Sequence, residues 1–500
     1  MNYCSTRGSI SGVTASQAIR LGIAPDGGLF TPETIPLVSL GDLQKLRDAS
    51  YQELATAILA LYLTDYPLAD LDQMVQAAYA HPAKFDHPEI APVVKLQDGQ
   101  YIIELWHGPT CAFKDVALQL LPYLMTKASL IAGDSTEIII LVATSGDTGK
   151  AALEGFKDVP GTKIIVFFPE QGVSQIQRMQ MVTQEGNNTF VVGVKGNFDD
   201  AQNGVKRIFT DPALADLLRK NNQAFSSANS INWGRLAPQI IYYFYSYLQL
   251  CREGSVKLGD KVNITVPTGN FGNILAAYFA KRMGLPVGRF ICASNSNNVL
   301  TDFLRTGVYD RKRQFYTTIS PSMDILISSN LERLLYYLTD CNPGVVNEWM
   351  AELQTNGRYE VDAHTKSRIQ SEFYGGFASE AETMATIQTV FKTTGQVLDT
   401  HTAVGKVVCD RYQQETGDTT RVLLAATASP FKFNSSVLAA ISGPATVANT
   451  DEFTLLHELQ ELSGLPIPAG LKGLEQMPVR HRQVCEKDEM DKTVMKLLGI

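Results

Sequence analysis

The stretch "LWHGPTCAFKDVALQLLPYL", residues 105–124, carries one lysine, Lys114, where a Gly-Pro-Thr turn precedes an apolar helical pattern. An ordinary lysine there would be solvated and paired with the neighbouring Asp115, because lysines are almost never fully buried. A lysine desolvated beside apolar side chains such as Phe113 instead has a lowered pKa and becomes a nucleophile. The other motifs of the chain decide between these two interpretations.

The stretch "VPTGNFGNILAAY", residues 266–278, is the best candidate for an anion-binding loop. Gly269 and Gly272 allow the backbone to approach a ligand closely, and Asn270 and Asn273 are suited to capping the helix that should follow. Free amides at a helix start bind phosphate without any net positive charge. The loop lacks the glycine spacing and the later acidic residue of a dinucleotide-binding motif, and an ordinary strand-to-helix turn is the alternative interpretation.

The stretch "ATSGDTGKAA", residues 143–152, is similar to a nucleotide-binding P-loop but does not satisfy its pattern. Thr144 stands where the first glycine is needed, and Ala151 stands where a serine or threonine is needed. What remains is a set of small hydrogen-bond donors at a second expected helix start, which suits a carboxylate or a phosphate. A plain capping turn is the alternative.

Two loops of this kind without a nucleotide motif, together with one lysine at a turn, favour a small cofactor that carries both a phosphate and an aldehyde. Pyridoxal phosphate fits this description. It needs a lysine to bond to its aldehyde, a backbone cradle for its phosphate and a partner for its pyridine nitrogen.

The elements that must position these residues follow a regular pattern. Residues up to about 90 are rich in helical periodicity, and two short apolar runs around "QDG" at 97–99 predict a strand hairpin. Beyond residue 137, a buried strand, a small polar loop and a helix recur, with strands expected at 137–143, 163–168, 189–194, 262–266 and 421–428. This alternation predicts an α/β fold with a parallel sheet covered by helices on both faces, and ligands bind beyond the carboxyl ends of such strands.

Composition excludes several classes of protein. The chain has 500 residues, 45% hydrophobic and 19% charged, with a formal net charge of −8, which is typical of a globular protein of two or three domains. The absence of a basic stripe argues against nucleic acid and anionic membranes as partners, and no stretch is long enough to span a membrane. Seven scattered cysteines without a CxxC pair favour reduced thiols and a cytoplasmic location. No metal-binding spacing is present, so no metal site is expected.

Nine blocks of the sequence together carry a family resemblance. They are "YCSTRG" at 3–8, "GIAPDGGLFTPE" at 22–33, "HGPTCAFKD" at 107–115, "ATSGDTGKAA", "GNFDDAQ" at 196–202, "NSINWGRLAPQ" at 229–239, "PTGNFGN", "PSMDILISSNLERLL" at 321–335 and "DTHTAVG" at 399–405. In these blocks the chain resembles the threonine synthase family of fold-type II pyridoxal-phosphate enzymes over essentially its full length.

The resemblance implies an α/β fold of the tryptophan synthase β type, with parallel-rich sheets flanked by helices in two or three domains. It suggests a mostly helical N-terminal region at 1–95, a small α/β domain with the cofactor lysine at 96–225, and a large α/β domain at 226–500. The family converts O-phospho-L-homoserine and water to L-threonine and phosphate, the last step of threonine biosynthesis. The alternatives are a related pyridoxal-phosphate lyase, such as a phospho-lyase or a serine/threonine dehydratase, and a catalytically silent homologue. The sequence neither requires nor excludes an oligomer.

The resemblance also implies roles for individual residues. Lys114 would be the catalytic lysine that holds the cofactor, with Phe113 beside it. The cofactor phosphate would bind to Gly269, Asn270, Phe271, Gly272 and Asn273. The pyridine nitrogen would contact Thr427, although the family usually has His-Pro where this chain has Ser429-Pro430, so Ser429 is a second candidate.

Substrate groups need further donors. We assign the substrate carboxylate to the loop that contains Thr144, Ser145, Gly146, Asp147 and Thr148. For the substrate phosphate we expect Arg235, whose planar guanidinium suits phosphate oxygens, with Lys432 and Arg178 as rivals. His107 and His401 lie in family blocks, with structural roles and proton transfer as open alternatives.

Overall fold

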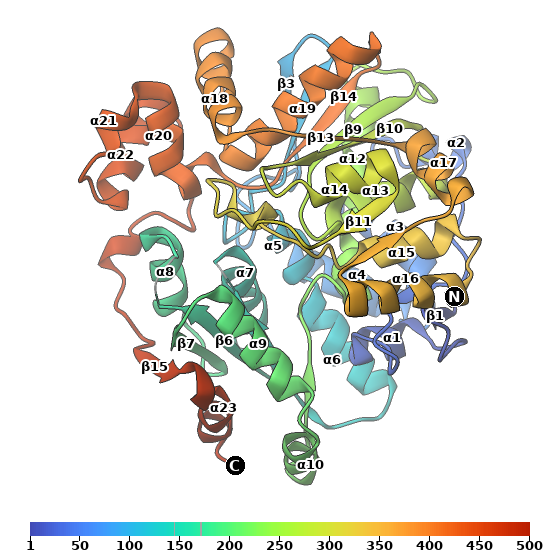
Figure 1. The fold of residues 1–500 in the computed structure, drawn as a ribbon, viewed down its shortest axis with the longest axis vertical. Coiled ribbons are helices and arrows are strands. Elements are labelled where there is room, and N and C mark those ends of the chain that lie inside the picture. The colour runs from blue at the N-terminus through green and yellow to red at the C-terminus, as the bar shows by residue number, and fades with distance from the viewer. Residues whose placement is uncertain (145, 171–172) are drawn as a thin grey trace.

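The computed structural model describes residues 1–144, 146–170 and 173–500, and two parallel-rich sheets organise it (Figure 1). The predicted α/β class is confirmed, but the five expected strand–loop–helix units do not build one sheet. Three of their strands lie in a smaller sheet and two in a larger one. Periodicity identifies a strand as buried on both faces, whereas the choice of neighbouring strand depends on tertiary packing.

The larger sheet has six strands. Its order is β13 (Phe373–Phe377), β10 (Val287–Ser294), β9 (Val262–Pro267), β14 (Val422–Ala426), β4 (Gln100–Glu104) and β3 (Val93–Gln97). Neighbouring strands are parallel except for β3, which pairs with β4 as the predicted antiparallel hairpin. The sheet therefore joins residues 93–104 to strands that lie beyond residue 260. The expected domain limits at residues 95 and 225 stay a prediction.

The smaller sheet has five strands, all of whose pairings are parallel. Its order is β15 (Gln483–Glu486), β7 (Thr189–Lys195), β6 (Thr162–Pro169), β5 (Glu137–Ala143) and β8 (Gln223–Ser226). The expected strand at 137–143 coincides with β5. Alternate residues of β5 enter different apolar clusters: Ile138 and Ile140 pack with the residues of α7 (Asp147–Phe156), whereas Ile139 and Leu141 pack with those of α9 (Phe198–Phe209). Helices therefore cover both faces, as the continuous apolar run predicts.

Helices surround the larger sheet as well. On one face, α13 (Gly272–Met283) packs on β9 and β10 and α12 (Pro238–Arg252) packs on α13 and β3, and on the other face α19 (Thr400–Thr416) packs on β9, β10 and β14. The first fourteen residues of α12 are all buried, as expected for its apolar sequence. Further helices between residues 114 and 394 are α5 (Lys114–Leu118), α6 (Leu121–Ile131), α8 (Gln175–Val182), α10 (Pro212–Lys220), α11 (Trp233–Leu236), α14 (Val299–Thr306) and α18 (Glu380–Thr394).

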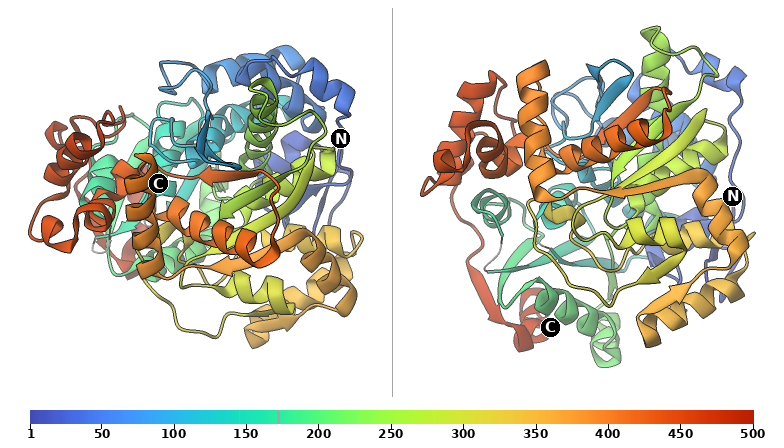
Figure 2. Two further views of the ribbon diagram at one scale, coloured as in Figure 1. Left: turned by 90° about the horizontal axis from the view of Figure 1, so that it is seen from above. Right: turned by 45° about the horizontal axis from the view of Figure 1, so that its top comes forward.

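The two ends of the chain add helices on opposite sides of the molecule, as the views in Figures 1 and 2 show. The N-terminal part contains β1 (Tyr3–Ser5), β2 (Phe30–Pro32), α1 (Ala15–Leu21), α2 (Leu40–Lys45), α3 (Tyr51–Tyr62) and α4 (Leu68–Ala78). The C-terminal part contains α20 (Asn434–Ser442), α21 (Pro444–Val447), α22 (Glu452–Ser463) and α23 (Met490–Leu498). A further lobe contains β11 (Val308–Asp310), β12 (Arg358–Glu360), α15 (Leu331–Leu338), α16 (Pro343–Asn356) and α17 (Ala363–Glu372). Short 3-10 helices are η1 (Pro321–Met323), η2 (Pro430–Phe433), η3 (Leu474–Gln476) and η4 (Lys487–Glu489).

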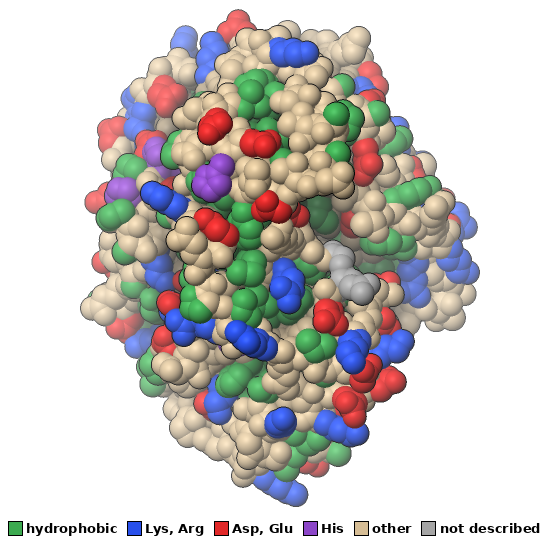
Figure 3. Space-filling view, turned by 90° about the vertical axis from the view of Figure 1, so that its left-hand side faces the viewer, with side chains coloured by type: hydrophobic (Ala, Val, Ile, Leu, Met, Phe, Trp, Pro, Cys, Tyr) green, Lys and Arg blue, Asp and Glu red, His purple; other side chains and the backbone are tan. Residues whose placement is uncertain are grey.

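Charged side chains are distributed over the surface of the molecule. On the face shown in Figure 3, basic and acidic side chains are interspersed with hydrophobic ones. Among the described residues, no helix combines the length and the apolar character that crossing a bilayer requires.

Arg333 of α15 is fully buried and connects three parts of the chain. Its Nε donates to the carbonyl oxygen of Phe30 at 2.9 Å, its Nη1 to Oδ1 of Asn330 at 2.6 Å, and its Nη2 to the carbonyl oxygen of Ile231 at 2.5 Å. Burial lowers the pKa of Arg333 to about 10. This side chain joins the N-terminal strand β2 to the segment that precedes α11.

We expect Arg333→Ala to destabilise the fold by about 3 to 5 kcal/mol, because it leaves buried acceptors without their donors. The measurement is the thermal unfolding midpoint, with Arg358→Ala as the control, since Arg358 is an exposed arginine paired with Glu360 at 3.8 Å. Equal midpoints for the two variants would show that Arg333 does not hold these segments together.

Candidate functional site

Loops that follow strands of both sheets meet around Lys114. The amide of Phe113 donates to the carbonyl oxygen of Thr427 at 2.9 Å, and Ala112 forms an isolated bridge with Ala428. These contacts fix the segment after β4 against the segment after β14. Lys114 then reaches across to Asp147, the first residue of α7 in the unit that begins with β5. The site therefore lies at the carboxyl ends of strands, as the strand pattern predicted.

Lys114 is buried and does not pair with its neighbour Asp115. Its side chain lies at the start of α5, and the residue is only 8% exposed. Asp115 turns away and accepts from Thr110, at 2.8 Å from the amide and 2.6 Å from the hydroxyl. Burial raises the pKa of Asp115 to about 6, even though these hydrogen bonds act to lower it. The interpretation of Lys114 as an ordinary solvated lysine is therefore wrong.

A glycine makes this turn feasible. A Cβ atom added to Gly108 would lie 2.4 Å from the Cβ of Asp115, which is far inside van der Waals contact. Only glycine lets the Gly-Pro-Thr turn fold so closely over the Asp115 carboxylate.

The Lys114 amine has two polar contacts on the opposite side. Its Nζ donates to Oγ of Ser322 at 3.1 Å and to Oδ2 of Asp147 at 3.4 Å. Burial lowers the pKa of Lys114. The cations Lys432 and Arg235 lower it further, whereas the Asp147 carboxylate raises it, and the net shift is downward. A lysine in such surroundings is a candidate nucleophile and base.

Asp147 holds a second buried lysine as well. Its Oδ1 lies 2.7 Å from Nζ of Lys432 and accepts from Nε2 of Gln177 at 3.0 Å. Burial alone would raise the pKa of Asp147, but Lys432 and Lys114 outweigh it and hold the pKa well below its ordinary value. Asp147 is therefore a carboxylate shared by two lysines.

Hydrogen bonds within the 144–148 loop and the first turn of α7 stabilise the conformation of this loop. The hydroxyl of Thr144 accepts from the amides of Gly146 and Gly149, each at 3.0 Å. Thr148 is half-buried in the first turn of α7. Ser145, which the sequence also assigns to this loop, lies outside the described residues.

The loop at 269–273 presents free amides at the start of α13. Phe271 is in the left-handed region with φ 62°, and α13 begins at Gly272. Within the described part of the chain, the backbone amides of residues 270–274 donate to no acceptor, and the buried Nδ2 atom of Asn273 has no partner. Such a row of unpaired donors at a helix start suits a phosphate group.

Neighbouring serine and asparagine side chains hold this loop in shape. Ser328 donates from Oγ to the carbonyl oxygen of Gly269 at 2.7 Å, and Asn330 donates from Nδ2 to that of Asn270 at 3.0 Å. A Cβ atom on Gly269 would lie 2.7 Å from the carbonyl oxygen of Ser322, so the loop packs tightly against the segment that contacts Lys114.

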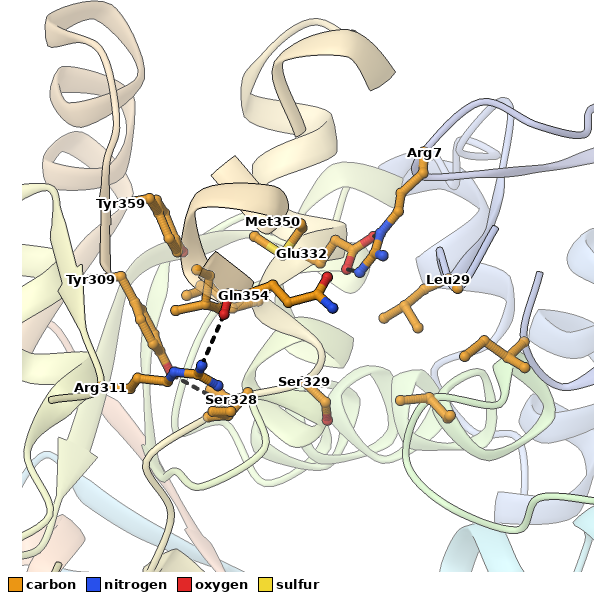
Figure 4. Close-up of a pocket in the computed structure, with 16 residues that line it drawn as sticks. Arg7, Leu29, Tyr309, Arg311, Ser328, Ser329, Glu332, Met350, Gln354 and Tyr359 are labelled. Carbon is orange, nitrogen blue, oxygen red and sulfur yellow. Dashed lines mark hydrogen bonds and ion pairs between the residues drawn. The ribbon is translucent and has the colours of Figure 1, made fainter. Parts of the chain in front are cut away.

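A cavity of about 310 Å³ lies next to Ser328 (Figure 4). Ser328 and Ser329 form part of its wall, together with Arg7, which is paired with Glu332 at 2.9 Å. Lys114 is not among its lining residues, so this cavity is separate from the site described above.

Thr427 and Ser429 differ in how their hydroxyls are used. The Oγ of Ser429 accepts from the amide of Phe431 at 3.3 Å and caps η2. Thr427 is fixed through its carbonyl oxygen, which accepts from Phe113, and its hydroxyl has no partner among the described residues. Both hydroxyls therefore keep a proton to donate, and that of Thr427 has neither a donor nor an acceptor among the described residues.

Arg235 lies in the same site without an acidic partner among the described residues. It is 5% exposed, its Nη1 donates to the carbonyl oxygen of Ala228 at 2.7 Å, and burial lowers its pKa to about 10. The two rivals differ: Lys432 is already bound to Asp147, and Arg178 is exposed on α8. Arg235 is the buried arginine that can meet an anion here.

The sequence did not assign Ser322 to the site and left the role of His401 open. Ser322 contacts Lys114 directly, and its amide donates to Nε2 of His401 at 3.2 Å. The other ring nitrogen of His401 lies 3.0 Å from Oδ1 of Asp399, so this histidine positions the η1 turn. Ser322 lies in the block 321–335, but no spacing rule links that block to Lys114. Among the described residues, no cluster of three or more His, Cys, Asp or Glu side chains could hold a metal ion.

Comparison with known proteins agrees with this geometry. The model described as "Threonine synthase N terminus" matches residues 2–79, "Pyridoxal-phosphate dependent enzyme" matches 91–428, and "Threonine synthase, C-terminal" matches 402–494. Threonine synthase from Saccharomyces cerevisiae is 38% identical, and the match covers 99% of each chain. The chain belongs to the threonine synthase family. The human protein "Threonine synthase-like 1" is 40% identical, and the chain spans only 64% of its length.

Solved structures of the family show the same fold. The pyridoxal-phosphate-bound threonine synthase from Brucella melitensis superposes with a TM-score of 0.87 at 37% identity, covering 99% of each chain. The yeast threonine synthase structure also gives a TM-score of 0.87, at 36% identity, covering 100% of this chain and 99% of that one. These comparisons confirm the predicted fold-type II architecture.

His107 lies at the edge of the site between two carboxylates. Its Nδ1 is 2.7 Å from Oδ1 of Asp86, and its Nε2 is 2.9 Å from Oε2 of Glu104. Burial alone would lower the pKa of His107, but these hydrogen bonds outweigh it and raise the pKa to about 9. Both nitrogens donate, so His107 is a charged bridge between β4 and the segment that precedes β3.

The pKa of His107 gives a pH-dependent stability. Because it is raised above the ordinary 6.5 or so, the stabilisation is complete below about pH 6.5 and is lost as the pH rises through about 9. We expect His107→Gln to cost about 1 to 2 kcal/mol at pH 6, allowing for the partly exposed carboxylates, and much less at pH 10. Thermal midpoints from pH 6 to 10 measure this, with the exposed His364→Gln as control. A pH-independent cost would refute the ion-pair assignment.

Proposed function

We propose that the protein is a threonine synthase, which converts O-phospho-L-homoserine and water to L-threonine and phosphate in the cytoplasm. The observation that carries the proposal is the buried Lys114, whose partner Ser322 packs against the loop of unpaired amides at 269–273, in a chain aligned along its whole length with threonine synthases. Pyridoxal phosphate would stabilise negative charge at the substrate Cα when bound.

The residues present fit that cofactor. Lys114 would bond to its aldehyde, with Phe113 alongside, and the amides at Gly269–Asn273 would bind its phosphate. Thr427 would bind the pyridine nitrogen, because its hydroxyl has no partner among the described residues; Ser429 stays the second candidate, since its hydroxyl accepts the cap of η2 and keeps its proton to donate. The unpaired amides and the unpartnered Nδ2 atom of Asn273 supply the donors that a phosphate dianion needs.

The chain's own groups then account for the proton transfers. The Lys114 amine would remove the proton from Cα and serve the later transfers at Cβ, and its lowered pKa brings it nearer the working pH. Burial of the site limits access of water. The substrate carboxylate would bind to the loop of Thr144, Ser145, Gly146, Asp147 and Thr148, with Asp147 contributing only its backbone, because its own carboxylate is held by Lys432 and Lys114. Arg235 would bind the substrate phosphate and stabilise it as it leaves.

The deciding experiment is incubation of the purified, pyridoxal-phosphate-loaded protein with O-phospho-L-homoserine, followed by assay of phosphate and amino acids. Equal amounts of phosphate and threonine support the proposal. Phosphate with 2-oxobutanoate in place of threonine would indicate a phospho-lyase, and no turnover would indicate a silent homologue.

Borohydride reduction followed by peptide mapping should place the cofactor on Lys114. A label on any other lysine would refute the role proposed for Lys114.

Gly272→Asp should abolish cofactor retention. A Cβ atom at Gly272 would meet Asn330, Ser230 and Gln239 at 3.5 to 3.9 Å, which is ordinary contact, so an alanine fits. The aspartate adds a negative charge beside the bound phosphate. Cofactor absorbance after gel filtration measures retention, and Gly272→Ala is the matched control. Equal retention in both variants would show that the loop does not bind the phosphate.

Arg235→Ala should lower kcat/KM for O-phospho-L-homoserine by about 30- to 1000-fold, equivalent to about 2 to 4 kcal/mol, because a charged hydrogen bond to phosphate is lost. Cofactor content should stay unchanged, and Arg235→Lys should recover little activity. Steady-state kinetics measure this, with Arg178→Ala as the control. An unchanged kcat/KM in Arg235→Ala, or a large loss in Arg178→Ala, would contradict the assignment.

A further inference from the structure

Two lysines share one carboxylate at the centre of the molecule. Lys432 is fully buried, with its Nζ 2.7 Å from Oδ1 of Asp147 and 2.9 Å from the carbonyl oxygen of Thr110. Lys114 lies 3.4 Å from the other carboxylate oxygen, which also accepts from Ser322 at 3.2 Å. The shorter contact belongs to Lys432, so the carboxylate is paired first with that residue.

The charges around Asp147 do not balance if both lysines are protonated. Lys114 faces Lys432 on η2 and Arg235 on α11, and both cations oppose a charge on Lys114. His401 on α19 lies near the carboxylate, and Asp115 on α5 is turned towards Thr110. Leaving an uncompensated charge in a buried site is costly, so the lysine with the weaker contact loses its proton most easily.

We propose that Lys432 is a positioning residue that holds the Asp147 carboxylate, and thereby leaves the Lys114 amine unprotonated and free to react. This inference rests on the proposed function, since it explains how Lys114 becomes the reactive amine of a pyridoxal-phosphate enzyme. It also gives Lys432 a role other than the substrate-phosphate ligand considered from the sequence. The Lys432 side chain is inaccessible to solvent, and it is already bound to two acceptors.

The test measures the reactivity of Lys114 in the full-length chain before pyridoxal phosphate is added. Trinitrobenzenesulfonate reacts only with unprotonated amines, so the rate of labelling at Lys114, read by peptide mass spectrometry, reports its protonation as the pH is varied. In Lys432→Met, the midpoint should rise by about one to two pH units, and labelling at neutral pH should slow about 10- to 100-fold. Asp147→Asn should shift the midpoint in the opposite direction.

Three further variants separate charge from packing. Lys432→Gln introduces an amide that can donate to the carbonyl oxygen of Thr110 but carries no charge. Its labelling midpoint at Lys114 should rise as in Lys432→Met. It replaces Lys432→Met if methionine prevents folding. Lys432→Arg keeps the charge and should retain the parent midpoint. Lys157→Met removes a lysine of a surface ion pair with Glu185 and should leave Lys114 unaffected.

An unchanged or lowered midpoint in folded Lys432→Met or Lys432→Gln would overturn the inference. Folding is checked by the thermal midpoint of each variant. Failure of the proposed function looks different, because the labelling shift would persist in a protein that forms no threonine. Conversely, a protein that makes threonine but shows no labelling shift would keep its function and lose this role for Lys432.

Discussion

The Asp147 carboxylate, buried between Lys432 and Lys114, is the interaction on which the arrangement of this site depends. A buried carboxylate is stable only when cations and donors replace the water it has lost. Here Lys432, Gln177 and Ser322 do so from separate segments of the chain. Each of these segments is thereby fixed in its position relative to Lys114.

This interaction also joins the two sheets. Asp147 follows β5 of the smaller sheet, whereas Lys114 and Lys432 come from segments that follow β4 and β14 of the larger sheet. Parallel strands place their following loops at one edge of a sheet, and here the segments that follow β4, β5, β9 and β14 come together. The site consists of those loops, and its supporting hydrogen bonds connect the loops to each other rather than to solvent.

A second buried group stabilises the surroundings of the phosphate loop. Arg333 and Asn330 at the start of α15 connect the 269–273 loop, the segment before α11 and strand β2. The N-terminal residues that the family model covers are therefore part of the support of the site. Their contribution is through backbone carbonyl groups, which any sequence could supply in the right geometry, so residue types alone do not reveal it.

Local features of the sequence were sufficient to predict the strands and helices named here and the loops between them. The apolar run at 137–143 became β5, the hairpin around 97–99 formed, and α5 and α13 begin at Lys114 and Gly272. The expected asparagine cap of α13 is wrong, because its N-cap is Phe271 and no side chain caps it. These properties depend on neighbours within a few residues, through periodicity, capping and backbone freedom. Residue types were likewise enough to recognise the family and its cofactor.

The tertiary structure alone decided which groups meet. It divided the five expected units between two sheets, turned Asp115 towards Thr110, and placed Ser322 on Lys114 although they are 208 residues apart in the chain. It also placed Lys432 on Asp147 and left the hydroxyl of Thr427 free while that of Ser429 caps η2. The physical reason is that strand order and burial determine these distances, and both depend on packing across the whole core rather than on the spacing of any motif.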